Sequence, residues 1–176
     1  MEEKKYAVLI DGDNISSKYL DSILNEMTKY GIATYKRIYC DFTSQQSSKW
    51  RRLVRDSGIQ AMQQFANTVG KNATDSTLII DAMDILYTGN VDGFCIVSSD
   101  GDFTRLAIRL KESGMDVIGM GESKTPRSFR AACTVFTDLE ILYEAESEDD
   151  EISTKGKKPA VKGLSLGKIK PKHMCI

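Results

Sequence analysis

The sequence predicts an α/β fold in which helices cover both faces of a largely parallel sheet. Short apolar runs typical of buried strands alternate along the chain with segments whose apolar residues recur at helical spacing. Strands separated by helices favour parallel pairing through right-handed crossovers, which gives three layers. Two of the apolar runs lead into acidic turns: residues 6–10 are followed at once by Asp11, and residues 94–97 by a polar turn that carries Asp100 and Asp102. With 176 residues and 41% hydrophobic content, the chain is long enough for one such domain.

Three strands and two helices are expected in the first half of the chain. After the strand at residues 6–10, apolar residues recur at three- and four-residue spacing in a helix that Gly31 ends, and Asp13, Asn14, Ser16 or Ser17 could cap it. The next elements, in order, are a strand at residues 32–39, a short basic helix at 47–56 that Gly58 ends, and an alternating strand at 59–65.

The second half of the chain continues this alternation. A helix is expected at residues 75–87, where the apolar side chains share one face, followed by the strand at 94–97. A helix at 103–111 and a strand at 116–120 come next, and residues 126–143 indicate a short helix, a strand near Val135 and a last helical turn. We expect a Rossmann-like strand order, with the first and fourth strands adjacent at the centre of the sheet.

The composition of the chain changes after Tyr143. Residues 144–151 are acidic and the remainder is mostly Lys, Gly, Pro and small residues, so we expect one domain at 1–143 and a disordered charged tail at 144–176. No apolar run is long enough to cross a membrane, and the four cysteines are scattered, which favours a reduced, cytoplasmic protein without a zinc site. The net charge of -1 does not by itself indicate nucleic-acid binding.

Five aspartates are candidates for a metal site at the carboxyl edge of the sheet. Asp11 and Asp13 follow the first strand, Asp100 and Asp102 follow the fourth, and Asp75 begins a helix on its core-facing side. Crowded carboxylates would repel one another unless a cation neutralised them, and Mg²⁺ or Mn²⁺ suits such oxygen ligands. Asp13 and Asp102 could equally cap helices, and Asp-Gly-Asp is also common turn chemistry.

Several further polar residues could serve the same edge. Asn14 either caps the first helix or holds a substrate phosphate or a metal-bound water. Asp81, about 120° from Asp75 around the helix, is expected to be a structural partner or to support the metal ligands from behind. Positive residues that could hold a polyanion are Lys71, Lys124, Arg127, Arg130 and the basic helix at residues 49–55. A charged helix face is usually only solvated, so that alternative stays open for the basic helix.

Four motifs stand in order along the chain. They are Asp11-Gly-Asp-Asn14, Lys71-Asn-Ala-Thr-Asp75, Ser98-Ser-Asp-Gly-Asp-Phe103 and Lys124-Thr-Pro-Arg-Ser-Phe-Arg-Ala-Ala-Cys133. Together they resemble the NYN domain, in the bacterial LabA-like branch of the PIN-like ribonuclease superfamily. The resemblance implies a PIN-like fold, with Asp11, Asp75, Asp100 and Asp102 as catalytic and metal-binding residues. The substrate-binding residues that we expect are Asn14, Ser99, Lys71, Lys124, Arg127 and Arg130.

The expected reaction is metal-dependent hydrolysis of a phosphodiester bond in RNA, with single-stranded RNA preferred. Asp11, Asp75 and Asp100 would hold one or two Mg²⁺ or Mn²⁺ ions that lower the pKa of a water and clamp the scissile phosphate. Asp102 would complete the metal shell or orient that water. The core has no histidine, which excludes a histidine pair acting as acid and base, so products with 5′-phosphate and 3′-hydroxyl ends are expected.

Substrate capture and two rival functions complete the expectations. Only 33 residues follow Tyr143, too few for the winged-helix RNA-binding module of many relatives, so capture would come from basic groups of the core, a protein partner or a homodimer. One rival is a non-catalytic RNA-binding or regulatory adaptor with the same fold. The other is a HAD-type phosphatase, whose Asp-x-Asp motif continues with Thr or Val where this chain has Asn14.

Overall fold

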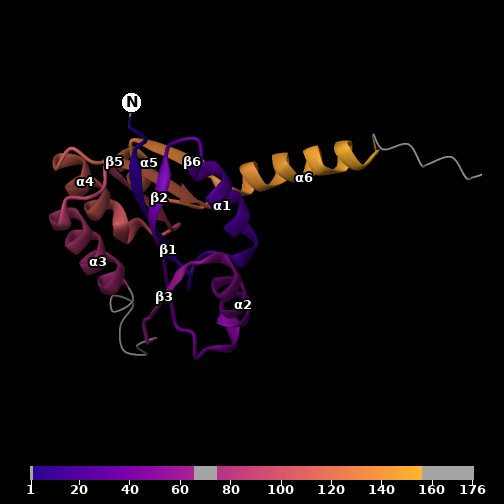
Figure 1. Cartoon of the computed structure of the whole chain (residues 1–176), viewed down its shortest axis with the longest axis horizontal. Helices are drawn as coiled ribbons and strands as arrows, with labels where there is room; N and C mark the ends of the chain where they lie inside the picture. Colours follow the sequence, from indigo (N-terminus) through magenta and orange to yellow (C-terminus); the bar gives the residue numbers. More distant parts are fainter. Residues whose placement is uncertain (1, 66–74, 156–176) are drawn as a thin grey trace, which may run out of the picture.

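A six-stranded sheet forms the centre of the molecule in the computed structural model, which describes residues 2–65 and 75–155 (Figure 1). The strands are β1 (Lys5–Asp11), β2 (Ile32–Cys40), β3 (Gln60–Gln63), β4 (Gly93–Val97), β5 (Asp116–Gly121) and β6 (Val135–Asp138). Their order across the sheet is β3-β2-β1-β4-β5-β6, and every pairing is parallel. The predicted α/β class, parallel sheet and central pairing of the first and fourth strands are therefore confirmed.

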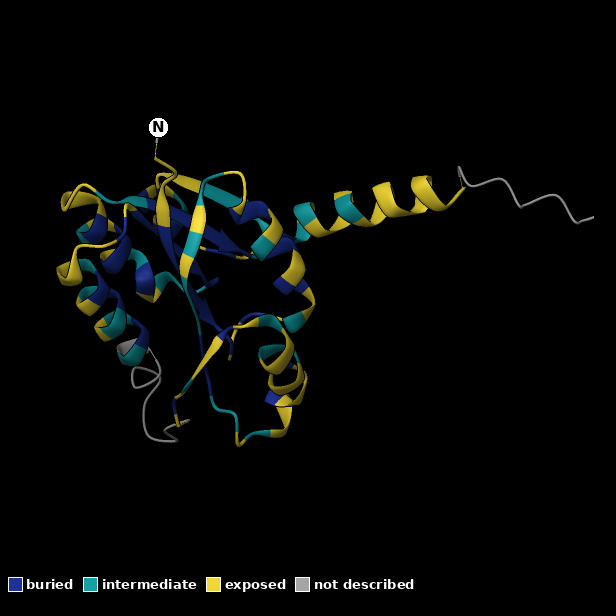
Figure 2. Cartoon of the chain, in the orientation of Figure 1, coloured by how far each residue is buried: buried dark blue, intermediate teal, exposed yellow. Residues whose placement is uncertain are grey.

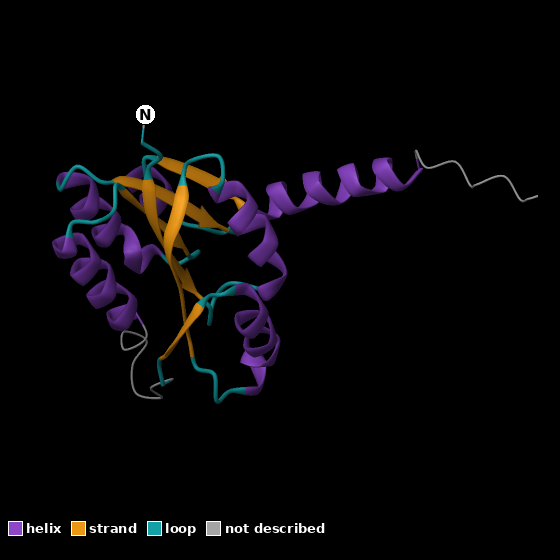
Figure 3. Ribbon diagram, viewed as in Figure 1, coloured by secondary structure: helices purple, strands orange, loops and turns teal. Residues whose placement is uncertain are grey.

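Helices lie on both faces of the sheet (Figure 3). They are α1 (Leu20–Met27), α2 (Ser48–Ser57), α3 (Asp75–Thr88), α4 (Thr104–Glu112), α5 (Arg127–Ala132) and α6 (Leu139–Lys155), with 3₁₀ turns η1 (Ser17–Tyr19), η2 (Gln45–Ser47) and η3 (Gly101–Phe103). Alternate side chains of β1 enter two apolar clusters, one with α1, α2 and α6 and one with α3, α4 and α5. No helix in the described part of the chain is long and apolar enough to span a membrane.

The two central strands are buried along almost their whole length (Figure 2). Each has a strand on either side and helices on both faces, so its sequence is continuously apolar rather than alternating. The chain first meets polar surroundings where these strands end, at their carboxyl edge. This is where the two acidic turns lie.

The first helical stretch begins with a 3₁₀ turn, and of the four predicted caps Ser16 is the one that the structure confirms. Ser16 caps η1, because its Oγ accepts a hydrogen bond from the Lys18 N–H at 3.4 Å, and α1 then runs only from Leu20 to Met27. Asp13 and Asn14 belong instead to the loop between β1 and η1, residues 12–16, which we call the β1–η1 loop. This loop is part of the candidate site described below.

The last helix differs from the disordered tail expected after Tyr143. α6 continues to Lys155, and its second half extends away from the domain (Figure 1). Its first turns are held to the core, because the Tyr143 ring packs edge-on against Tyr19 with centroids 5.6 Å apart and Ser22 donates a hydrogen bond to Glu146. Once a helix is nucleated on a core, residues such as Ala and Glu extend it at little cost. The remainder of the expected tail, 156–176, lies outside the described residues.

Candidate active site

The carboxyl ends of β1 and β4 bring the two acidic turns together. Ile10 is paired with Val97 across these strands, so the residues that follow, Asp11 and Ser98, are neighbours. The Ser98 hydroxyl donates to Asp11 Oδ2 at 2.8 Å, and Asn14 Nδ2 donates to the same oxygen at 2.9 Å. Asp11 is 3% exposed and Ser98 is fully buried. A buried carboxylate is thus held by two neutral donors.

Burial raises the pKa of the Asp11 carboxyl to about 6. The hydrogen bonds from Asn14 and Ser98 lower this pKa, whereas the nearby charges of Asp13 and Asp100 raise it. Both hydrogen bonds reach Oδ2, so Oδ1 accepts none from the described residues, and no described cation forms an ion pair with this carboxylate. A charged carboxylate without a positive partner in such surroundings is stabilised by a bound cation.

Asp100 begins η3 beside Asp11. Its own N–H donates to Ser98 Oγ at 3.0 Å, and its Oδ1 accepts from the Asp102 N–H at 2.9 Å. Asp100 is therefore the residue that caps η3, and the alternative role of Asp102 as a helix cap is wrong. Asp102 is exposed in the first turn of η3. Ser98 links the two turns, because one hydroxyl donates to Asp11 and accepts from Asp100.

Asp13 joins the β1–η1 loop to the ends of β2 and β3. Its Oδ1 accepts from the Asp41 N–H at 3.0 Å, and its Oδ2 accepts from Gln64 Nε2 at 3.2 Å. Gly12 before it lies against β2, where an added Cβ would be 2.8 Å from the Ile38 side chain. Its φ is not positive, so close approach rather than turn geometry explains this glycine. Asp13 is not a helix cap.

A pocket of about 300 Å³ opens beside Asp100. Its lining residues are Asn14, Ser99, Asp100, Gly101, Lys124 and Pro126. Three of the expected substrate-binding residues, Asn14, Ser99 and Lys124, therefore meet here. Ser99 is tied down, because its Oγ accepts from the Glu122 N–H at 2.9 Å, whereas the exposed Lys124 forms no ion pair with a described residue. Among the described residues, Lys124 thus offers this pocket an unpaired positive charge next to the Asp100 carboxylate.

Comparison with known proteins decides the family. The family model of the NYN domain matches residues 5–140, which include both acidic turns and the pocket. The chain belongs to the NYN domain family. NYN domains are part of the PIN-like nuclease superfamily, so the recognition made from the four motifs is confirmed at this level. Placement in the LabA-like branch stays a prediction.

Two individual proteins resemble this NYN domain. It is 26% identical over 162 residues to an uncharacterized protein, MJ0482, of Methanocaldococcus jannaschii, an alignment that covers 89% of this chain and 62% of that relative. A crystal structure of a protein of unknown function, VPA0982, from Vibrio parahaemolyticus matches with a TM-score of 0.63 at 19% identity, covering 78% of this chain and 96% of that one. The second likeness supports the fold alone.

The predicted metal ligands are only partly placed in this NYN domain. Among residues 2–65 and 75–155, no three acidic, cysteine or histidine side chains form a group that could hold a metal ion. Asp11 and Asp100 do lie together, whereas the Asp75 side chain and Lys71 lie outside what the structure describes. Mg²⁺ is usually bound through one or two carboxylates plus water and substrate phosphate. The two described carboxylates, with Asp11 Oδ1 free, fit that mode of binding.

The two predicted arginines do not line the pocket beside Asp100. Arg130 holds the neighbouring loop, because its Nε donates to the Thr125 carbonyl at 3.1 Å and its Nη2 to the Ser123 carbonyl at 2.8 Å. Its guanidinium also lies 4.5 Å from the centroid of the Phe136 ring. Arg130 therefore shapes the loop that carries Lys124. Arg127 is exposed at the first residue of α5.

Sequence reasoning missed Ser98 and identified Asp81 correctly as a structural partner. Ser98 directly follows β4, and the pairing of β4 with β1 is the signal that could have placed it beside Asp11. Asp81 Oδ2 accepts hydrogen bonds from the Tyr39 hydroxyl at 2.6 Å and from Arg37 at 3.1 Å. It ties α3 to β2 and takes no part in the site.

Proposed function

We propose that this NYN domain is a metal-dependent ribonuclease that hydrolyses phosphodiester bonds of RNA at Asp11 and Asp100. The observation that carries the proposal is the buried Asp11 carboxyl, whose pKa is raised to about 6 and whose Oδ1 has no described hydrogen-bond donor. A carboxylate in these surroundings favours a cation, and the adjoining pocket offers Lys124 to a phosphate. Membership of a nuclease superfamily supports the same class of reaction.

Mg²⁺ or Mn²⁺ is the proposed cofactor, because both prefer oxygen ligands. Asp11 and Asp100 would hold the ion, with Asp75 as the further carboxylate that the family resemblance implies. When bound, the ion would neutralise charge on the scissile phosphate and lower the pKa of the attacking water. Products with 5′-phosphate and 3′-hydroxyl ends follow from attack by water on phosphorus.

The side chains of the chain itself orient the reacting groups. Ser98 and Asn14 both hold Asp11 Oδ2, which fixes the carboxylate so that Oδ1 is the oxygen left for a ligand. Lys124 contacts a non-bridging oxygen of the phosphate. Asp102, which is exposed beside Asp100, accepts a hydrogen bond from the attacking water and orients it. Single-stranded RNA is the proposed substrate, since its unstacked nucleotides can reach a site among loops.

Incubation of single-stranded RNA with wild-type protein, Asp11→Asn and Asp84→Asn tests the proposal. Asp84 is exposed on α3 and serves as the matched control. The reactions contain Mn²⁺, Mg²⁺ or EDTA, and the product ends are mapped. We expect metal-dependent cutting that leaves 5′-phosphates in the wild type and in Asp84→Asn, and none in Asp11→Asn. Equal cutting by all three proteins would remove Asp11 from the mechanism.

A non-catalytic RNA-binding adaptor is the second candidate function. It would use the same exposed cation, Lys124 in the pocket beside Asp100, to hold an RNA phosphate without a metal ion. RNA binding without cutting, by the wild type and Asp11→Asn alike, would establish this adaptor instead. The HAD-type phosphatase gains no support from the family match.

A further inference from the structure

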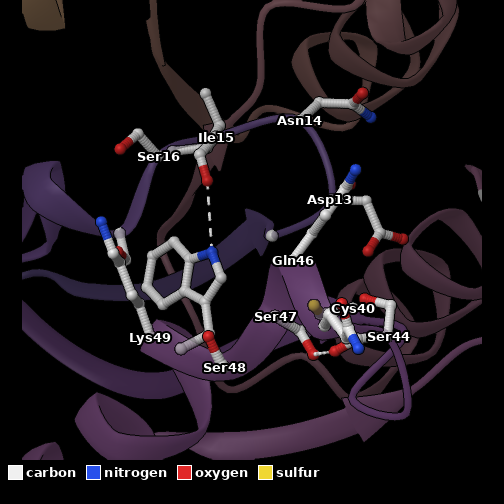
Figure 4. A pocket seen from close by; sticks show the side chains of 14 residues that line it. Asp13, Asn14, Ile15, Ser16, Cys40, Ser44, Gln46, Ser47, Ser48 and Lys49 are labelled. Atoms are coloured by element: carbon white, nitrogen blue, oxygen red, sulfur yellow. Dashed lines mark hydrogen bonds between the residues drawn. The ribbon is translucent and has the colours of Figure 1, made fainter.

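A second cavity, of about 490 Å³, lies next to the proposed active site (Figure 4). One wall is the β1–η1 loop and the other is the segment from Ser44 to Trp50, which contains η2 and the start of α2. Asn14 lines both this cavity and the pocket beside Asp100. A ligand that extends from Asp100 past Asn14 therefore enters the second cavity.

Two contacts define the shape of this cavity before any ligand arrives. The Trp50 indole is 3% exposed, and its Nε1 donates to the Ile15 carbonyl at 3.2 Å, shown as a dashed line in Figure 4. This bond fixes the distance between the start of α2 and the β1–η1 loop. Gly12 also lines the cavity, and its close contact with Ile38 keeps the loop against β2. A preformed cavity binds a ligand without the cost of ordering its own walls.

The lining of the cavity is polar and has unused hydrogen-bonding groups. Figure 4 shows Gln46 extending from η2 toward Asp13 and Asn14. Gln46 is exposed, and its amide makes no hydrogen bond with a described residue, so both its donor and its acceptor are available. The Ser44 and Ser47 hydroxyls are used, because they donate to the carbonyls of Asp41 and Ser44. A primary amide is a side-chain group that pairs with the edge of a nucleobase.

Positive charge lies on the far side of the cavity. A third hollow, of about 460 Å³, shares Ser16, Ser17 and Lys49 with it and also contains Lys18 and Arg52. Lys49 and Arg52 are exposed and form no ion pair with a described residue, although Asp21 lines the same hollow. Carboxylates, a polar cavity and free cations thus follow one another along the surface. An RNA nucleotide carries its base on a ribose that is flanked by two phosphates. One phosphate at a cation held by the carboxylates, the base in the cavity and the next phosphate at Lys49 and Arg52 would match this arrangement.

We infer that the cavity between the β1–η1 loop and α2 binds one unstacked base of the RNA, the base next to the scissile phosphate. Gln46 pairs with the edge of this base, and Lys49 and Arg52 contact the phosphate beyond it. The inference rests on the proposed ribonuclease function, because only then does the neighbouring Asp11 site define the ligand as RNA. Its consequence is a preference for one base beside the position of cleavage, set by Gln46.

The sole tryptophan of the chain reports directly on this cavity, because Trp50 forms part of its wall. Metal-free protein in EDTA is titrated with AMP, GMP, CMP and UMP while Trp50 fluorescence is recorded, with excitation at the red edge of the indole absorption. We expect a saturable change whose midpoint differs among the four bases. Gln46→Ala should weaken the preferred nucleotide about 5- to 10-fold, the effect of one hydrogen bond. Gln60→Ala, an exposed glutamine on β3, should match the wild type.

Ribose 5-phosphate and inorganic phosphate are titrated in parallel to separate the base from the phosphate. If either gives the same response and midpoint as the nucleotides, the cavity binds phosphate and the base assignment is wrong. If no nucleotide changes the fluorescence, or if Gln46→Ala binds every base as the wild type does, the inference is overturned as well. The exposure of Gln46 means that its substitution leaves the core intact.

Mapping of cleavage positions on mixed-sequence RNA distinguishes this inference from the proposed function. We expect wild-type cutting to favour one base beside the cut, and Gln46→Ala to cut with that preference lost. Cutting without base preference, together with no fluorescence response, would reject the base site and leave the ribonuclease standing. Base-selective binding without any cutting would reject the ribonuclease and leave a nucleotide-binding cavity.

Discussion

The turn after β1 and the turn after β4 share the sequence Asp-Gly-Asp, but their residues have different roles. After β1, the first aspartate is buried beside Ser98 and the second ties the loop to Asp41. After β4, the first aspartate caps η3 and the second is exposed. Because the tripeptides are identical, burial and strand register decide the role of each residue. The first aspartate of each turn is the one that contacts Ser98.

The largest expected difference between the first and second aspartates of a turn is in the rate of RNA cleavage. We expect Asp100→Asn to lower the rate of RNA cleavage at least 100-fold, because it removes a proposed metal ligand, and Asp102→Asn to lower it about 10-fold, because a misoriented water still reacts. Single-turnover cleavage in Mn²⁺ at saturating protein measures both rates. A larger loss for Asp102→Asn than for Asp100→Asn would reverse the assignment within this turn.

Replacement of the glycine by alanine should also destabilise the protein more in one turn than in the other. A Cβ at position 12 would lie 2.8 Å from the Ile38 side chain and 3.1 Å from Cys40 Cβ, both in the packed core, whereas a Cβ at position 101 would lie 3.2 Å from the more exposed Pro126 ring. We therefore expect Gly12→Ala to cost about 2–3 kcal/mol of unfolding free energy, and Gly101→Ala less than about 1 kcal/mol. Urea unfolding of the metal-free proteins measures both. Equal costs would mean that the loop relaxes away from β2.

The pH dependence of stability tests the buried Asp11. Its folded pKa of about 6 lies above the ordinary value of 3.8, so the folded state binds the proton more tightly. Stability of the metal-free protein is therefore fully present below about pH 4 and is lost as pH rises through about 6. We expect Asp11→Asn to remove this loss and to be about 3 kcal/mol more stable than wild type at pH 8.

Urea unfolding of the wild type and Asp11→Asn in EDTA, from pH 4 to pH 8, follows this effect. Asp84→Asn is the control, since Asp84 is exposed and should keep the wild-type slope. Mn²⁺ at pH 8 should stabilise the wild type and leave Asp11→Asn unchanged, because binding to the folded state raises its stability by mass action. If the two pH profiles of unfolding free energy coincide, ionisation of Asp11 does not lower the stability of the metal-free protein.

Sequence patterns could predict the edge at which the site lies but not the role of each aspartate. The order of apolar runs determines that β1 and β4 are neighbours, and this places Asp11 near Asp100. Which carboxylate turns inward depends on contacts such as Ser98 with Asp11 and Gly12 with Ile38, which residue types alone do not specify. The cavity depends on the bond from Trp50 to Ile15, 35 residues apart, and no local pattern encodes it.

The smallest expected effect concerns the second aspartates of the two turns. Asp13→Asn keeps one acceptor for either the Asp41 N–H or Gln64 but not both, so it should destabilise the protein by about 0.5–1 kcal/mol. Part of this cost is offset, because loss of the Asp13 charge also lowers the raised pKa of Asp11. Asp102→Asn should change stability by less than about 0.5 kcal/mol, since its side chain is exposed.

The pH dependence of the cost of Asp13→Asn separates the lost hydrogen bond from the lost charge near Asp11. Because the charge of Asp13 acts on Asp11 only when Asp11 is ionised, the cost of Asp13→Asn should be larger at pH 4 than at pH 8 in EDTA. In the Asp11→Asn background this pH dependence should vanish, while the cost of the lost hydrogen bond should remain. A cost that stays constant with pH in the wild-type background would show that Asp13 acts only as a tie between loops, and that burial and the charge of Asp100, without Asp13, raise the pKa of Asp11.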